Sequence, residues 1–157
     1  MFNKILIPLD GSDLAGKVLA KAEDLAKSFK AQLTLLTVGS AAVGEISESS
    51  PEVGTEAVAR LPVVKYLEET AAALRAKNLA VTWDYKQGNP ALEIMAYAVG
   101  HRMDLIILGS HGAGEVAWHL GSVAHRVFNH SPVPVLLLRV LGPKLPEHKS
   151  DLGYFSM

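Results

Sequence analysis

The sequence predicts an α/β fold of Rossmann-like type: a single domain built on an open parallel five-stranded sheet, with helices on both faces. Short apolar runs of strand length alternate with longer stretches whose apolar residues recur at helical spacing. This alternation is typical of strand–helix units joined by right-handed crossovers. The length of 157 residues corresponds to about one domain, at roughly 150 residues per domain.

Five apolar runs are the predicted strands. The first, fourth and fifth runs are apolar at nearly every position, as expected of strands that helices cover on both faces. The predicted strands span residues 5–9, 33–38, 79–83, 105–108 and 133–138.

Four helices are predicted between these strands. The first follows Ser12 or Asp13, either of which can cap it. The third follows the capping residue Asn89, with Pro90 at its first position. The second helix covers about residues 61–77 and the fourth about residues 122–129. In each helix, apolar residues at helical spacing form a stripe that is predicted to face the sheet. In helix order, the stripes are Leu14, Val18, Ala22, Leu25 and Phe29; Val64, Leu67, Ala71 and Leu74; Ala91, Ile94, Met95, Ala98 and Val99; and Val123 and Val127, with Phe128 as a further candidate.

Two segments fit no regular element. Residues 39–60 are a long connection for a compact domain and carry glutamates among serines and glycines. We expect a mobile, solvated loop there, with a lid or a partner-contact segment as the alternative. Residues 141–157 are expected to be a loosely ordered C-terminal tail, or to dock their aromatic residues on a neighbour. The folded domain is therefore expected to span residues 1–140.

Composition excludes several classes of function. Lys and Arg number 15 and Asp and Glu 16, so the formal net charge is −1, whereas nucleic-acid-binding proteins usually carry a basic excess. The absence of cysteine excludes disulfides, thiolate zinc sites and cysteine nucleophiles. The first apolar run is too short for a signal peptide, and no stretch approaches the ~20 apolar residues of a membrane helix. We therefore expect a cytoplasmic protein with no membrane or nucleic-acid partner.

The ends of two predicted strands carry residues suited to a phosphate-containing ligand. In open parallel sheets, ligands bind beyond the carboxyl ends of the strands, where the strand order reverses. Asp10 follows the first strand, the glycine-rich stretch 109–114 follows the fourth, and Gly121 opens the last helix. Glycines let the backbone approach an anion, and a helix N-terminus offers free N–H groups and a favourable dipole. The Ser122 hydroxyl could add a donor, and Asp10 could accept from a ribose hydroxyl or an adenine amino group. The alternative is that these glycines only make tight turns.

Two other patterns do not predict a catalytic or metal site. Gly11-x4-Gly16-Lys17 resembles the start of a P-loop, but Val18 stands where the magnesium-binding hydroxyl belongs, and Gly16 and Lys17 also fit inside the first helix. Asp84 is the one weak candidate for a magnesium ligand at a strand end. The six histidines show no helical metal-ligand spacing. No metal site is predicted from the protein alone, and no catalytic residue, since nothing resembles a nucleophile elbow.

Several motifs resemble those of the universal stress protein family over about residues 3–139. They are Pro8-x-Asp10-Gly11-Ser12, the run from Asp104 to Gly112, the run from Leu120 to Val127, and the closing run from Ser131 to Leu137. The resemblance implies the strand order 3-2-1-4-5, so that Asp10 and Gly109 share one crevice. It also implies a homodimer through the last strand, residues 133–138.

The resemblance further implies a ligand and a set of binding residues. Some family members bind ATP and others do not, so the implied ligand is ATP, with or without Mg²⁺, or another adenine nucleotide. The implied binding residues are Pro8, Asp10 and Val38 on the adenosine side, Leu108 under the nucleotide, Gly109 and Gly112 around the phosphates, His111 as the nearest cationic candidate, and Gly121, Ser122 and Val123 at the far end of the phosphates.

One spacing departs from the pattern of the ATP-binding members, which is Gly-x2-Gly-x9-Gly followed by Ser or Thr. Between Gly112 and Gly121 lie residues 113–120, which number eight and not nine. Ala113 stands where many binding members have a basic residue. The loop could absorb the missing residue, or the shortening could pull Gly121 away from the phosphates.

Two functions are compatible with the sequence. The first is a regulatory protein of the stress response that binds ATP or another adenine nucleotide, with at most slow hydrolysis because no general base is evident. The second is a stress-related dimer or interaction module of the same fold that binds no nucleotide, in which the shortened loop closes the crevice. The apolar edge strand at 133–138 favours pairing, and the protein partner is unknown.

Overall fold

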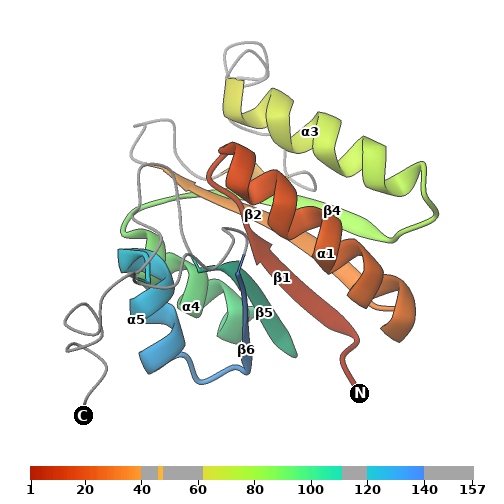
Figure 1. Ribbon diagram of the computed structural model, residues 1–157. Helices are drawn as coiled ribbons and strands as arrows, with labels where there is room; N and C mark the ends of the chain where they lie inside the picture. Colours follow the sequence, from red (N-terminus) through yellow and green to blue (C-terminus); the bar gives the residue numbers. More distant parts are fainter. Residues whose placement is uncertain (40–45, 48–61, 111–119, 140–157) are drawn as a thin grey trace, which may run out of the picture.

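The structure, a computed structural model, describes residues 1–39, 46–47, 62–110 and 120–139 (Figure 1). In chain order the elements are β1 (Lys4–Pro8), α1 (Asp13–Phe29), β2 (Gln32–Gly39), β3 (Ile46–Ser47), α3 (Pro62–Arg75), β4 (Val81–Gln87), α4 (Pro90–Gly100), β5 (Leu105–Gly109), α5 (Ser122–His130) and β6 (Val135–Leu138). The tail at 141–157 lies outside the described residues.

The strands of the described residues form one sheet in the order β3-β4-β2-β1-β5-β6. All neighbours from β4 to β6 pair in parallel, which confirms the parallel five-stranded sheet and its order 3-2-1-4-5. The additional strand β3 lies within the segment 39–60, which was predicted to be a loop, and pairs antiparallel with Tyr85 and Asp84 of β4. A strand of two residues is too short to show a periodicity in the sequence. Gly39, the first residue of that segment, ends β2.

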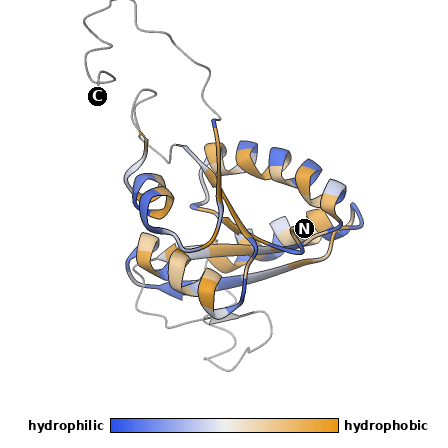
Figure 2. Ribbon diagram, turned by 90° about the horizontal axis from the view of Figure 1, so that it is seen from below, coloured by the Kyte–Doolittle hydropathy of each residue, from blue (hydrophilic) through white to orange (hydrophobic). Residues whose placement is uncertain are grey.

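Helices α1 and α3 cover one face of the sheet, and α4 and α5 cover the other (Figure 1). Alternate residues of β1 enter two separate cores: Ile5 and Ile7 lie on the side of α1 and α3, and Leu6 lies on the side of α4 and α5. In Figure 2 the central strands are hydrophobic, while the helices also carry hydrophilic residues. Burial on both faces explains why the central strands appear in the sequence as nearly continuous apolar runs.

Side-chain caps begin two of the helices at the predicted positions. Ser12, and not the alternative Asp13, caps α1: its hydroxyl accepts a hydrogen bond from the Ala15 N–H at 3.3 Å. Asn89 caps α4 by accepting from the Leu92 N–H at 3.2 Å, with Pro90 at the first helical position. Both caps satisfy N–H groups that a helix start leaves without an intrahelical partner.

The predicted boundaries of β4 were wrong. The strand runs from Val81 to Gln87 and not from 79 to 83. Its outer half alternates between the buried residues Trp83 and Tyr85 and the partly exposed Asp84 and Lys86. Such a period of two belongs to a strand with only one face in a core, and a search for continuous apolar runs stops too early there.

The inward faces of the helices agree with the prediction at most positions, although Leu14 of α1 is only partly buried and belongs to neither core. The predicted stripe of α3 is buried at every position. Val99 of α4 and Phe128 of α5, both predicted to face inward, are 54% and 53% exposed. Tyr97 occupies the buried face of α4 instead, and Ala124 joins Val127 on that of α5.

Tyr97 is buried despite its hydroxyl because that hydroxyl donates a hydrogen bond to the Asp84 carboxylate of β4. Burial, followed by this hydrogen bond and the charge of Asp84, raises the pKa of Tyr97 above its ordinary value. Asp84, the weak magnesium candidate, is thus engaged in linking α4 to β4.

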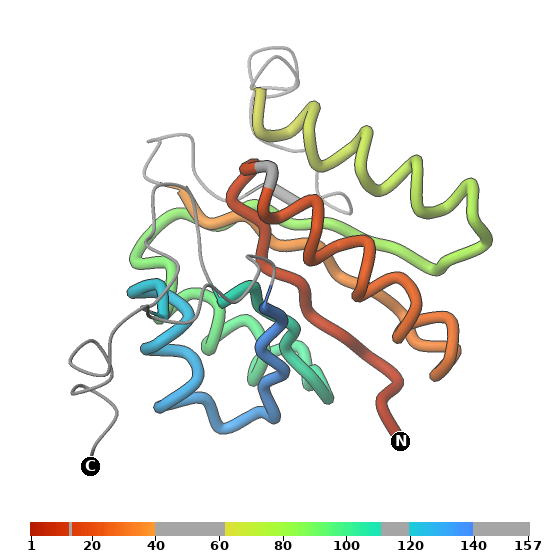
Figure 3. The backbone as a smooth tube through the Cα atoms, in the orientation of Figure 1, coloured from red at the N-terminus to blue at the C-terminus, as the bar shows by residue number. Residues whose placement is uncertain are grey.

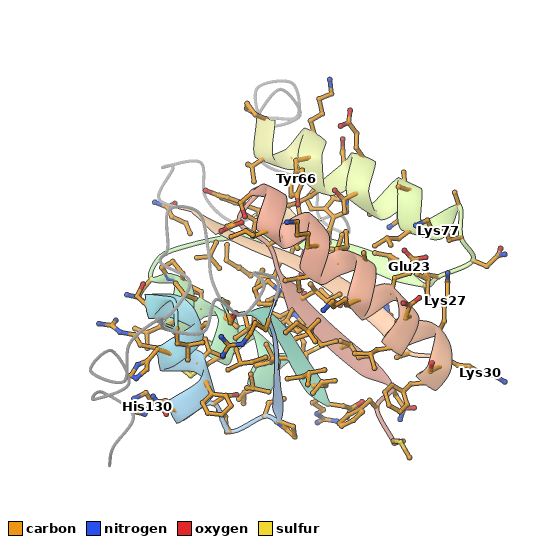
Figure 4. The ribbon with its side chains drawn as sticks, viewed as in Figure 1. Glu23, Lys27, Lys30, Tyr66, Lys77 and His130 are labelled. Atoms are coloured by element: carbon orange, nitrogen blue, oxygen red, sulfur yellow. The ribbon has the colours of Figure 1, made fainter. Side chains whose placement is uncertain are left out.

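An ion cluster ties α1 to the turn after α3. The Glu23 side chain, only 11% exposed, accepts from Lys27 and from Lys77, each at 2.7 Å. Figure 4 shows the two lysines on either side of the glutamate. Hydrogen bonds from Lys27 and Lys77 hold the pKa of Glu23 below its ordinary value. The cluster therefore stabilises the fold only while Glu23 is ionised.

The substitution Glu23→Gln is expected to lower the midpoint of urea denaturation near neutral pH, because a neutral amide cannot compensate two ammonium groups. The matched control is Glu69→Gln, since Glu69 pairs with Lys65 at 3.7 Å and both side chains are largely exposed, so its removal should have little effect. The folded-state pKa of Glu23 is lowered, so its contribution is present above the ordinary value of 4.5 and is lost as the pH falls below it. Equal midpoint shifts for the two variants at every pH would contradict this role.

Gly16 and Lys17 lie inside α1, as the helical alternative to a P-loop expected. A Cβ atom added at Gly16 meets nothing within 4 Å. Glycine in a helix interior costs about 0.5–1 kcal/mol relative to alanine. The substitution Gly16→Ala should therefore raise the free energy of unfolding by about this amount, measured by urea denaturation. The exposed Ala20, one turn further along α1, is the control: Ala20→Gly should lower stability, and destabilisation by Gly16→Ala would refute this assignment of Gly16.

Candidate functional site

A cavity of about 190 Å³ opens at the carboxyl ends of β1, β2 and β5. Its lining comes from these strand ends and from the first turns of α1, α4 and α5. Figure 3 follows the backbone from β1 into α1. Residues of the beginning of α1 contribute to the lining. The volume far exceeds the roughly 10–15 Å³ that a single water requires, so the cavity is large enough to be a candidate ligand site.

Eight of the ten predicted site residues line this one cavity. They are Pro8, Asp10, Val38, Leu108, Gly109, Gly121, Ser122 and Val123. The other two, His111 and Gly112, lie outside the described residues. Segments that are far apart in the sequence thus converge, because β1 pairs with β2 on one side and with β5 on the other.

Sequence reasoning missed the parts of the lining that α1 and α4 contribute. Ala15 and Val18 of α1 and Pro90 and Ile94 of α4 border the cavity. Val18 and Ile94 were predicted to face inward, but only as core residues. The signal available in the sequence was their place in the first two turns of helices, because those turns lie beside the strand ends in a parallel α/β sheet.

Asp10 is held in a fixed orientation at the end of β1. Its Oδ1 accepts from the Ser12 N–H at 2.9 Å and from the Ser12 hydroxyl at 2.5 Å. Gly11 between them has φ +78°, a conformation that glycine adopts without strain. The strand end is also anchored, since the buried Thr37 hydroxyl donates to the Leu9 carbonyl at 2.9 Å. Asp10 is therefore a preorganised acceptor at the edge of the cavity.

The N-terminus of α5 differs from those of α1 and α4. Its cap is Gly121, which makes no side-chain cap hydrogen bond. The Gly121 N–H donates to the Ser110 carbonyl at 2.8 Å, and the Gly121 carbonyl accepts from the His125 N–H at 2.8 Å. The backbone of the cap is thus fixed, while no cap side chain engages the N–H groups of Ser122 and the residues after it. These groups, with the positive end of the helix dipole, can bind an anion in the cavity.

Charge is scarce around the cavity. Asp10 is the single charged side chain in its lining within the described part of the chain. Its influence reaches Tyr66 of α3, labelled in Figure 4: burial first, and then the negative charge of Asp10, raise the pKa of Tyr66. A ligand in the cavity would meet one carboxylate, one serine hydroxyl, apolar side chains and backbone N–H groups.

The described residues offer neither a metal-ligand cluster nor a membrane span. They contain no group of three or more His, Cys, Asp or Glu side chains placed to hold a metal ion. None of the described helices combines the length and the apolar character that crossing a bilayer requires.

The chain is similar to known proteins over most of its length. Residues 1–139 match the model of the universal stress protein family. Universal stress protein YxiE of Bacillus subtilis is 36% identical over 148 residues, which cover 88% of this chain and 100% of that protein. Universal stress protein MJ0531 of Methanocaldococcus jannaschii is 34% identical over 149 residues, covering 88% of this chain and 83% of that protein.

Solved structures resemble the fold as a whole. Universal stress protein UspA from Lactobacillus plantarum superposes with a TM-score of 0.70 at 25% identity, covering 88% of this chain and 98% of that one. A universal stress protein in complex with cAMP has a TM-score of 0.68 at 21% identity, covering 89% and 98%. One from Archaeoglobus fulgidus in complex with dAMP has a TM-score of 0.63 at 18% identity, covering 88% and 98%.

Proposed function

The chain belongs to the universal stress protein family, and we propose that it is a member that binds an adenine nucleotide in the cavity at the ends of β1, β2 and β5. The observation that carries this proposal is the pairing of two features across one cavity. Asp10 provides a fixed hydrogen-bond acceptor, and the N-terminus of α5, with a glycine cap, provides donors for an anion.

These features suit the parts of a nucleotide in turn. The apolar side chains of Leu36, Val38 and Ile94 offer a surface for the base. Asp10 accepts from ribose hydroxyls, and the first turn of α5 receives the phosphates. The complexes of related folds with cAMP and dAMP support an adenine nucleotide as the ligand class.

The short spacing at residues 113–120 raised the concern that Gly121 lies too far from the phosphates. Gly121 nevertheless borders the same cavity as Asp10, and its N–H is hydrogen-bonded to Ser110 at the end of β5. This supports a position of α5 that serves the cavity despite the shorter connection. ATP, with or without Mg²⁺, is the ligand to test first.

The proposed role is regulatory, in a stress response in the cytoplasm. This role is inferred from the family rather than from the site. Hydrolysis of ATP is expected to be slow at most, because no general base is evident in the sequence. The first assay is to denature the purified protein and identify the released small molecules by mass spectrometry.

A homodimer through β6 is the second part of the proposal. β6 is an edge strand of the described sheet. The carbonyls of Pro134 and Leu138 accept from β5, so by the alternation of a strand the backbone N–H of Leu137 points to the open edge. Pairing of this edge with a second copy would not depend on a nucleotide. The dimer is therefore also compatible with the alternative function, a dimeric interaction module that binds no nucleotide.

Gly121→Val is expected to abolish adenine nucleotide binding, because a branched side chain at the buried cap enters the cavity beside the phosphate donors. The control is Gly100→Val at the end of α4, where an added Cβ meets nothing within 4 Å and which does not line the cavity. Equilibrium titration with ATP and AMP measures binding, and circular dichroism checks that both variants fold. Unchanged affinity in a folded Gly121→Val protein would place the nucleotide elsewhere.

Leu137→Pro is expected to yield monomers, because proline removes the N–H at the open edge while leaving the β5 ladder intact. Leu137→Ala is the control, since it also shortens the side chain but keeps the N–H. Light scattering at micromolar concentration distinguishes the species. A monomeric parent protein would refute the dimer, and a dimeric Leu137→Pro variant would refute this edge as its interface.

A further inference from the structure

No lysine, arginine or histidine is found among the described residues that line the proposed nucleotide cavity. Among the described lining residues, Asp10 is the one charged side chain, and it is negative. The connection from β5 to α5, residues 111–119, contains neither Lys nor Arg, and its one carboxylate is Glu115. Neither the described lining nor the composition of that connection supplies a lysine or arginine for a phosphate.

Among the described residues, the donors at the anion end of the cavity are therefore backbone N–H groups, chiefly those at the start of α5, and the Ser122 hydroxyl. A helix N-terminus is equivalent to about half a positive elementary charge, spread over the N–H groups of its first turn. That is enough to favour one phosphate. It is much less than the charge of a triphosphate, and each additional phosphate would have to leave water without a cation to pair with it.

The negative charge of Asp10 further disfavours a ligand with several phosphate charges. Its position is fixed by Ser12, at 2.9 Å from the N–H and 2.5 Å from the hydroxyl, so it cannot turn away when an anion enters. Repulsion between this carboxylate and the ligand grows with the number of phosphate charges. It is the same for any ligand of equal charge, whatever the base.

We propose that the cavity is selective for adenine nucleotides of low phosphate charge: it binds AMP and cyclic AMP in preference to free ATP, and it binds ATP well only when a divalent cation accompanies the phosphates. This inference rests on the proposed function, since it concerns the same cavity. It assigns the discrimination among adenine nucleotides to charge rather than to size.

The test is calorimetric titration with adenosine, AMP, cyclic AMP and ATP, each in EDTA and in excess Mg²⁺. The titrations are run at a pH of about 8, above the ordinary range in which free histidine carries a charge. In EDTA, ATP should bind at least about tenfold more weakly than AMP, and Mg²⁺ should largely remove this difference because it lowers the negative charge of ATP to about that of AMP. The affinities of adenosine and cyclic AMP should be nearly independent of Mg²⁺.

A pair of variants separates charge from shape. Ser122 lines the cavity and is exposed at the first position of α5, so Ser122→Lys adds an ammonium at the anion end, and Ser122→Gln adds length without charge. The readout is the ratio of the ATP to the AMP dissociation constant in EDTA, which is unaffected by a general loss of affinity. The ratio should fall at least about fivefold in Ser122→Lys and stay at the parent value in Ser122→Gln.

The outcomes separate this inference from the proposed function. Free ATP that binds as tightly as AMP in EDTA, or an equal change of the ratio in both variants, would overturn the charge selectivity and leave nucleotide binding intact. Failure of adenosine and all three nucleotides to bind would overturn the proposed function itself.

Discussion

The reversal of the chain between β1 and β5 is the constraint on which the rest of this structure depends. The two strands are neighbours in the sheet, but β1 leads into α1 on one face, and β5 precedes α5 on the other. The helices that adjoin these two strand ends therefore diverge, and the space between them becomes the cavity. This is why Asp10 and Gly109, almost a hundred residues apart in sequence, border the same cavity.

The sequence predicted those parts of the molecule that depend on a single periodicity. Strands buried on both faces, such as β1 and β5, have an unmistakable apolar signal, and the stripe of α3 follows from helical spacing alone. The apolar signal fails where a buried residue also makes a polar interaction or where only alternate residues are buried. Tyr97 is buried because Asp84 accepts a hydrogen bond from its hydroxyl. The part of β4 beyond Trp83 was not predicted because its residues alternate between buried and partly exposed.

The candidate site was predictable at its strand ends and at the start of α5, but not at α1 and α4. A topological rule locates ligands at the carboxyl ends of strands, and that rule selects Asp10 and Gly109 directly from the sequence. Which turn of a helix borders the cavity depends on how the helix lies on the sheet, so Val18 and Ile94 were recognised only as core residues. The capping pattern points to the same helix start: Ser12 and Asn89 satisfy their own helices, whereas Gly121 leaves the start of α5 for another acceptor at a cost of only a few tenths of a kcal/mol.

The two borders of the sheet are unequal, and this limits how copies of the chain can assemble. One border ends in β3, whose two residues pair with only Asp84 and Tyr85 of β4. The other ends in β6, with the parallel ladder to β5 on its inner side. In the proposed dimer, two identical copies would join their β6 borders about a twofold axis, so each copy would present the same surface to the other. An assembly built on this border alone would be closed at two chains, with no free β6 edge from which a filament could grow.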